Sequence, residues 1–227
     1  MKFITLSGVQ CCIRENGSGG PVIFWGTGHF CENEMEQIWD ALMKLVPQEN
    51  FILAAFESND WNRDFSPWPA PAVFKNEDFG GEGRKTLDWL TLHYIPYMEE
   101  LYGKGRAYNL AGYSLSGLFA LWAAYESDLF SGIVCCSGSL WYENWDRYVN
   151  CHQIRRACHI YLSLGQKEEK TRNSIMALVG ERTRNQEKRL KSDLSVQSVI
   201  LEWNPGGHFA EAEMRLAKGI KWLIQNQ

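Results

Sequence analysis

The sequence contains no concentrated run of basic residues. Its 23 lysine and arginine residues are outnumbered by 27 aspartate and glutamate residues, so the formal net charge is −4 at pH 7. A protein that binds nucleic acid usually presents a basic patch to the phosphates, and this composition argues against such a partner. A small molecule is the partner that we expect instead.

Long apolar runs are absent as well. No apolar stretch reaches the roughly 20 residues that a membrane-spanning helix needs, and the start of the chain has no long apolar core of the signal-peptide kind. The seven cysteines are odd in number and show no C-x-x-C spacing. We therefore expect reduced, mostly buried thiols and no metal site, in a cytoplasmic protein without a membrane partner.

Short apolar runs alternate with segments of helical periodicity along the chain. This alternation is typical of an α/β protein with a mostly parallel sheet and helices on both faces. No internal repeat or domain linker is present, and 227 residues can bury one sizeable core, so residues 1–227 are expected to form a single domain. Strands are predicted at residues 3–6, 9–13, 22–25, 51–56, 108–111, 132–136, 159–164 and 196–203.

Helices are expected between most of these strands. The spacing of apolar residues predicts one that begins at residue 33 and others over residues 83–102, 118–125, 141–148, 173–191 and 210–224. Pro96 should kink or divide the second of them, because proline cannot donate a helical hydrogen bond. Residues 57–81 form a long irregular segment, and loops of this length are usually functional or mobile.

One strand-turn-helix segment has a serine at its turn. The sequence Gly112-Tyr113-Ser114-Leu115-Ser116 separates an apolar strand from a helix. A nucleophile elbow requires this context, because the sharp turn raises the serine hydroxyl above the end of the sheet. The usual pattern is G-x-S-x-G, so Ser116 departs from it, with Gly117 one place late. The motif alone leaves a second interpretation open, in which Ser114 is simply the N-cap of a helix.

A base and an acid can be sought at the carboxyl ends of later strands, where the working residues of open α/β sheets lie. His208 follows both the serine and the last predicted strand, and Gly206 and Gly207 precede it. Glu168 or Glu169 follows the strand that ends near residue 164, and we favour Glu168. The order serine, acid, histidine is that of the α/β hydrolases. An ordinary loop histidine and a solvated Lys/Glu turn are the alternatives.

An ester-cleaving site also needs donors for an oxyanion. The backbone N–H of Leu115 follows the candidate nucleophile, and the turn after the strand at residues 22–25 offers Thr27 or Gly28 as the second donor. The alternative for these two residues is an ordinary tight turn between a strand and a helix.

The elbow, residues 111–119, resembles that of the putative-esterase group of α/β hydrolases, which includes esterase D-type enzymes and esterases that open ferric enterochelin. Residues 63–68, 95–97, 137–141, 163–173 and 207–208 are similar to other segments of that group, over roughly residues 20 to 225. The resemblance implies an eight-stranded α/β-hydrolase fold without a large lid domain. It also implies serine-esterase chemistry without a cofactor, with Ser114 as nucleophile, His208 as base and Glu168 as acid.

We therefore expect a serine hydrolase that acts through an acyl-enzyme on a small or medium ester, with aryl and siderophore-type esters among the candidates. One alternative is acyl transfer to an alcohol. The other is a binding protein with weakened catalysis, which the replacement of the usual motif glycine by Ser116 would favour. Arg63, Trp68 and Trp141 are candidate substrate contacts, although Arg63 could instead pair with Asp64. Trp61, Tyr142 and Trp145 could complete an aromatic wall or pack in the core.

Overall fold

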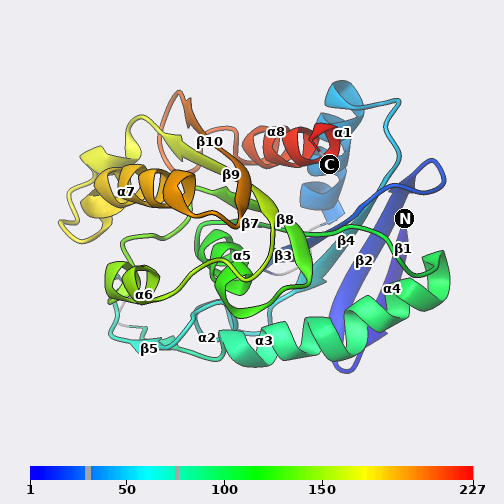
Figure 1. Cartoon of the computed structure of the whole chain (residues 1–227), viewed down its shortest axis with the longest axis horizontal. Helices are drawn as coiled ribbons and strands as arrows, with labels where there is room; N and C mark the ends of the chain where they lie inside the picture. Colours follow the sequence, from blue (N-terminus) through cyan, green and yellow to red (C-terminus); the bar gives the residue numbers. More distant parts are fainter. Residues whose placement is uncertain (29–31, 75–76, 227) are drawn as a thin grey trace.

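The computed structural model describes residues 1–28, 32–74 and 77–226, so His29 and Cys31 lie outside the described residues. An eight-stranded sheet forms the centre of the molecule, in the order β1-β2-β4-β3-β7-β8-β9-β10 (Figure 1). Its strands are β1 (Lys2–Leu6), β2 (Val9–Asn16), β3 (Val22–Thr27), β4 (Phe51–Glu57), β7 (Tyr108–Tyr113), β8 (Phe130–Cys136), β9 (Cys158–Gly165) and β10 (Val196–Asn204).

The sheet is parallel from β4 to β10 and antiparallel only where β2 pairs with β1 and β4. All six residues of β3 are buried, as are the last five of β8 and all but one of β9. Strands covered on both faces read as continuous apolar runs, which is why these were visible in the sequence. The predicted eight-stranded, mostly parallel sheet is confirmed.

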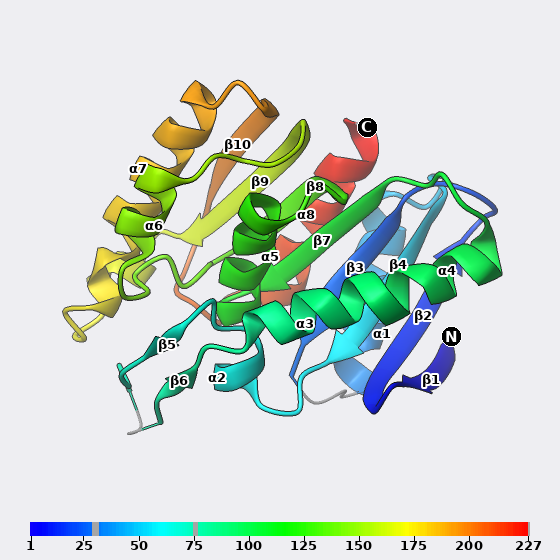
Figure 2. The same cartoon turned by 60° about the horizontal axis from the view of Figure 1, so that its bottom comes forward.

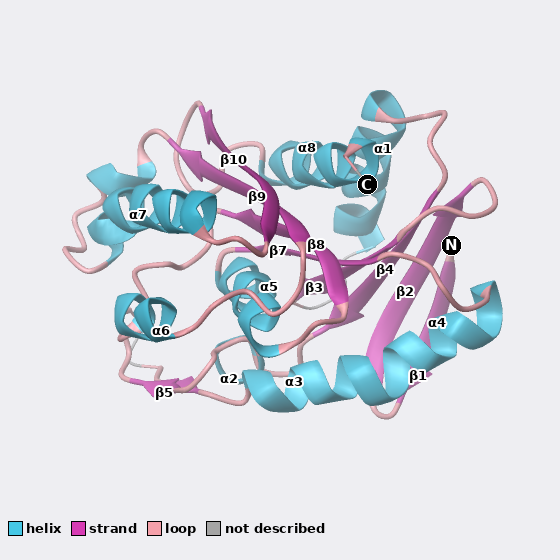
Figure 3. Cartoon of the chain, viewed as in Figure 1, coloured by secondary structure: helices cyan, strands magenta, loops and turns pink. Residues whose placement is uncertain are grey.

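Helices cover both faces of this sheet, as Figures 2 and 3 show. The helices α1 (Glu32–Leu45) and α8 (Ala212–Gln225) pack on one face and form a core with Trp25, Leu53 and Tyr161. The opposite face is covered by α3 (Gly83–Trp89), α4 (Ile95–Tyr102), α5 (Leu115–Glu126), α6 (Trp145–Cys151) and α7 (Val179–Ser192). The α5 helix is buried over most of its length, so it is apolar on every side.

The helix predicted over residues 83–102 is interrupted just before Pro96, as predicted, but its two parts remain joined end to end. A π-helical turn, Leu90–Tyr94, joins α3 to α4, and the backbone N–H of Ile95 donates to the carbonyl of Leu90. The widened turn accommodates the proline ring at the start of α4, where the missing N–H is least costly. Figure 1 shows α3 and α4 as one long rod along the edge of the molecule.

The helices α6 and α7 begin several residues later than predicted. The side chain of Asn173 accepts hydrogen bonds from the backbone N–H groups of Ile175 and Met176, which favours a 3₁₀ turn before α7 starts at Val179. Asn144 has a left-handed φ of 62° and delays the start of α6 to Trp145.

The irregular segment 57–81 is only partly irregular. It contains a one-turn helix, α2 (Trp61–Asp64), and a small two-stranded sheet formed by β5 (Pro69–Ala70) and β6 (Phe79–Gly80). Elements this short have no apolar periodicity that a sequence pattern could reveal.

Two expectations from composition concern thiols and membranes. The six described cysteines form no disulfide, and five of them are buried, with Cys151 exposed. No helix in the described ranges combines the length and the apolar character that crossing a bilayer would require.

Candidate active site

The turn between β7 and α5 holds Ser114 in a strained conformation. Its φ of 58° and ψ of −121° are unusual for a residue with a side chain. Gly112 permits the turn, because a Cβ atom there would lie 2.2 Å from the carbonyl oxygen of Ser116. Strand and helix therefore pass close to each other, with the serine at the tip between them.

Ser116 fits this turn without disturbing it. Its side chain is buried, accepts a hydrogen bond from the backbone N–H of Tyr113 at 3.0 Å and donates to the carbonyl oxygen of the same residue at 3.1 Å. The close approach that usually requires glycine occurs one residue later. A Cβ at Gly117 would lie 3.1 Å from the carbonyl oxygens of Cys136 and Gly112. The displaced glycine in the motif thus has a packing reason.

Replacing Gly112 with alanine should destabilise the protein by about 3 kcal/mol, because backbone atoms of α5 must move to admit the new methyl group. Gly207→Ala is the matched control, since a Cβ there meets nothing within 4 Å. Urea unfolding of both variants measures the difference. Equal stability of the two would show that strand and helix are not in the close contact described.

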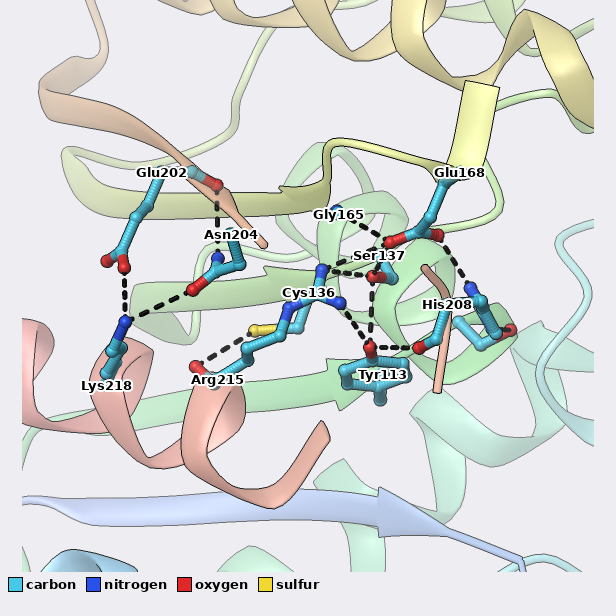
Figure 4. Close-up of polar contacts among 11 residues, drawn as sticks. Tyr113, Cys136, Ser137, Gly165, Glu168, Glu202, Asn204, His208, Arg215 and Lys218 are labelled. Atoms are coloured by element: carbon cyan, nitrogen blue, oxygen red, sulfur yellow. Dashed lines mark hydrogen bonds and ion pairs between the residues drawn. The ribbon is translucent and has the colours of Figure 1, made fainter. Parts of the chain in front are cut away.

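His208 connects the serine to an acid. Its Nε2 lies 3.1 Å from Ser114 Oγ, and its Nδ1 lies 2.7 Å from Glu168 Oε2. Figure 4 shows Glu168 and His208 facing each other at the carboxyl ends of the strands. The structure therefore brings together the three residues that the sequence singled out, in hydrogen-bonded order.

The two candidate acids have different surroundings. Glu168 is buried, whereas Glu169 points away and forms an ion pair with Arg184 at 2.7 Å, with 32% of its side chain exposed. The carboxylate beside the imidazole thus belongs to Glu168.

Burial alone would raise the pKa of Glu168. Hydrogen bonds from His208, Ser137 and the backbone N–H of Gly165, together with the charge that His208 can carry, outweigh burial and hold the pKa below the ordinary carboxyl value. The carboxylate is therefore ionised and can stabilise a protonated imidazole.

The candidate oxyanion donors line the same cavity as Ser114. Leu115 is the first residue of α5, so its backbone N–H has no acceptor within the helix. Thr27 ends β3, and both Thr27 and Gly28 line the same cavity as Ser114 and Leu115. Their placement is compatible with two N–H groups directed at one oxygen.

The cavity over Ser114 has a volume of about 1340 Å³. The aromatic residues of its lining include Trp61, Phe79 and Trp141. Carboxylates are also numerous among the described lining residues, which include no lysine or arginine: Glu34, Asp60, Glu77, Asp78 and Glu213. The cavity is thus aromatic and acidic.

Arg63 and Trp68, proposed as substrate contacts, are not among the described residues that line this cavity. Arg63 forms ion pairs with Asp64 at 3.0 Å and Glu82 at 3.4 Å, which is the alternative that its neighbour in the sequence suggested. Trp68 donates to the carbonyl oxygen of Glu143 and packs against other aromatic rings, including Tyr142 and Trp145. Three of the five predicted aromatic residues, Trp68, Tyr142 and Trp145, therefore pack in or against the core, and Trp61 and Trp141 line the cavity.

The sequence pattern missed Arg215, which lies behind Glu168 within α8. One signal was available: Arg215 shares a helical face with Gly219 and Leu223, both of which are buried. A charged residue on an apolar face implies a buried partner. Within the described ranges, no three histidine, cysteine or acidic side chains are grouped as metal ligands.

The chain is similar to known proteins along most of its length. The family model described as Putative esterase matches residues 11–209. The uncharacterized protein YbbA of Bacillus subtilis (strain 168) is 28% identical over 182 residues, which cover 77% of this chain and 72% of YbbA.

Solved structures share the fold at low identity. The IroE-like serine hydrolase from Shewanella oneidensis matches with a TM-score of 0.80 over 96% of this chain and 76% of its own, at 16% identity. Siderophore hydrolase EstB from Aspergillus nidulans matches with a TM-score of 0.77 over 99% of this chain and 94% of its own, at 13% identity. The expected α/β-hydrolase fold is confirmed. Since the family model covers most of the sequence, this chain belongs to the putative esterase family of hydrolases.

Proposed function

We propose that this protein is a serine esterase that hydrolyses carboxylic esters through an acyl-enzyme on Ser114. The observation that carries the proposal is the continuous contact from Ser114 Oγ through both nitrogens of His208 to Glu168. A serine that merely capped a helix would need neither a strained turn nor an imidazole within 3.1 Å of its hydroxyl. The same contacts speak against a binding protein that has lost its catalytic groups.

In the proposed reaction, His208 Nε2 takes the proton from Ser114 Oγ as the oxygen attacks the ester carbonyl. The backbone N–H groups of Leu115 and Thr27 or Gly28 stabilise the negative oxygen of the tetrahedral intermediate. His208 then gives its proton to the departing alkoxide. A water molecule, deprotonated by the same nitrogen, attacks the acyl group, and the proton returns to Ser114 as the acid leaves.

A test of the acyl-enzyme uses competition between water and an added alcohol. A p-nitrophenyl ester and a phenyl ester of the same acid should give the same ratio of transfer product to free acid, because both pass through one acyl-enzyme. A ratio that changed with the leaving group would contradict a common intermediate. The ratio itself also distinguishes the two activities: mostly free acid indicates hydrolysis, and mostly transfer product indicates acyl transfer to the alcohol.

The substrate is proposed from the walls of the cavity. The structural neighbour EstB is a siderophore hydrolase, and a cavity of about 1340 Å³ could accept an ester of medium size with an aryl group against Trp61 and Trp141. The acidic lining disfavours a strongly anionic ligand, such as a ferric catecholate complex. A neutral or cationic aryl ester is therefore the substrate class that we propose.

Substrate charge should change kcat/KM in a fixed order. For esters of equal size, we expect a trimethylammonium-bearing substrate to exceed its carboxylate analogue by about tenfold, with the uncharged analogue between them. Burial and the nearby Glu213 raise the pKa of Glu34, so the preference should grow with pH as this carboxyl group ionises. In Glu213→Gln the difference between the charged substrates should shrink. A preference for the carboxylate ester would contradict the assignment.

A further inference from the structure

A buried arginine lies behind the carboxylate that contacts His208. Arg215 is in the first turn of α8, and only 1% of its side chain is exposed. Its Nη2 lies 3.2 Å from Glu168 Oε1 and also donates to Ser137 Oγ, while its Nη1 donates to Tyr113 Oη at 2.8 Å. Figure 4 shows the guanidinium among these side chains. The ion pair is therefore shielded from solvent.

The two oxygens of Glu168 have separate partners. Oε2 faces His208, whereas Oε1 accepts hydrogen bonds from the Gly165 backbone N–H at 2.7 Å, from Ser137 Oγ at 2.6 Å and from Arg215. A carboxylate with only one contact could rotate away from the imidazole. The donors at Oε1 oppose that rotation, and of these three donors Arg215 is the charged one.

Arg215 also connects the segments that carry the site. Tyr113 immediately precedes Ser114 and donates through its hydroxyl to the carbonyl oxygen of His208. Ser137 follows β8, and Glu168 lies just beyond β9. One guanidinium thus contacts side chains at the ends of three neighbouring strands without touching Ser114 or His208 itself.

We propose that Arg215 is a positioning residue, which orients Glu168 toward His208 and stabilises its negative charge. This inference rests on the proposed function, because the orientation of Glu168 matters to catalysis only if Ser114 is the nucleophile. Arginine suits the position since its planar fork reaches Glu168, Ser137 and Tyr113 at once. A lysine has one nitrogen and could keep the charge but only part of these contacts.

The test is the pH dependence of kcat/KM for p-nitrophenyl acetate. It compares the wild type with Arg215→Gln, Arg215→Lys and the control variant Arg184→Gln. Arg184 pairs with the adjacent Glu169, so its variant removes a neighbouring Arg–Glu contact without touching Glu168. We expect Arg215→Gln to lower kcat/KM by roughly 10- to 100-fold, the size of loss typical when a group that orients a metal-binding side chain is removed. Arg184→Gln should resemble the wild type.

The acid limb of the pH profile distinguishes positioning from simple packing. Removing a buried cation makes protonation of the adjacent groups easier, so the limb should move to higher pH in Arg215→Gln. Arg215→Lys keeps the cation, so it should recover part of the activity and leave the limb near its wild-type position. Lower activity in Arg215→Gln with an unmoved limb, or no gain in Arg215→Lys, would show a merely structural role and overturn the inference.

A double-mutant cycle covers the case in which Arg215→Gln folds poorly. Arg215→Gln combined with Glu168→Gln removes both charges of the ion pair. No buried charge is then left without a partner, so this double variant should fold. If Arg215 acts through Glu168, then adding Arg215→Gln to Glu168→Gln should change kcat/KM by less than about threefold. A further loss as large as in the wild-type background would contradict the inference.

The outcome for the wild type separates the two proposals. Suppose that the wild-type protein hydrolyses the ester and Ser114→Ala does not. Full activity and an unmoved acid limb in Arg215→Gln would then overturn the inference about Arg215 but not the proposed function. Hydrolysis that survived Ser114→Ala would overturn the proposed function, and the inference with it.

Discussion

Ser114→Ala should lower kcat for ester hydrolysis by about 10⁴- to 10⁶-fold, as large a loss as any single substitution at this site should cause. The hydroxyl oxygen is the atom that forms the acyl bond, so nothing else at the tip of the turn can replace it. Alanine tolerates the strained backbone as well as serine does, and the fold should persist. Steady-state hydrolysis of p-nitrophenyl acetate, with thermal unfolding as the check on folding, measures the change.

Ser116→Ala is the matched control for the nucleophile. Ser116 lies two residues away, but the residue is 1% exposed and its side chain is hydrogen-bonded to Tyr113. Losing these bonds should disturb the turn slightly, and we expect kcat to stay within about tenfold of the wild type. If Ser116→Ala abolished turnover while Ser114→Ala preserved it, Ser116 would be the nucleophile and the assignment of the elbow would be wrong.

Glu168→Gln should lower kcat by about 10³- to 10⁴-fold, a smaller loss than that of Ser114→Ala. The amide is nearly the same size as the carboxylate but cannot neutralise the imidazolium, and it can hold His208 in the wrong tautomer. Glu169→Gln, one residue along the chain, should leave kcat unchanged because its carboxylate pairs with Arg184. Loss of activity in Glu169→Gln and not in Glu168→Gln would reverse the assignment.

The same carboxylate should make stability depend on pH. Because the folded-state pKa of Glu168 lies below the ordinary value of 4.5, ionised Glu168 stabilises the fold at pH above that value. This stabilisation is lost as the pH falls toward the folded-state pKa. Urea unfolding of Glu168→Gln should therefore give a free energy that falls less steeply with acid than in the wild type.

The parts of the fold that were predictable are those with a strong local pattern. The strands β3, β4, β8 and β9 lie in the interior of the sheet, so each is a continuous apolar run that needs no tertiary information. Helix boundaries were less predictable, since the start of α7 depends on one hydrogen-bonding side chain, Asn173.

The site divides in the same way. Ser114 and His208 were recognisable because each sits at a turn directly after a strand, where glycine residues mark the bend. Choosing between Glu168 and Glu169 needed the direction of each side chain, which a turn of mixed charge does not encode. Arg215 contacts Glu168 from a distant helix, and no spacing in the sequence links the two residues.

Substrate contacts were the hardest to predict. Trp68 and Trp141 both follow strand-end segments and are equally aromatic, yet Trp141 lines the cavity and Trp68 packs against Tyr142. Packing among many residues decides on which side of a loop an indole ring lies, so the composition of the loop does not predict it. The position of the Arg63 side chain is likewise set by its ion pairs with Asp64 and Glu82, which keep it from contacting a substrate.

The most direct test of the central claim is reaction of the folded protein with a fluorophosphonate probe, followed by peptide mapping of the labelled residue. An activated serine should react, and the label should map to Ser114, with labelling slowed in Glu168→Gln and absent in Ser114→Ala. A label on any other residue, or no label on a folded sample that hydrolyses esters, would contradict the proposal that Ser114 is the nucleophile.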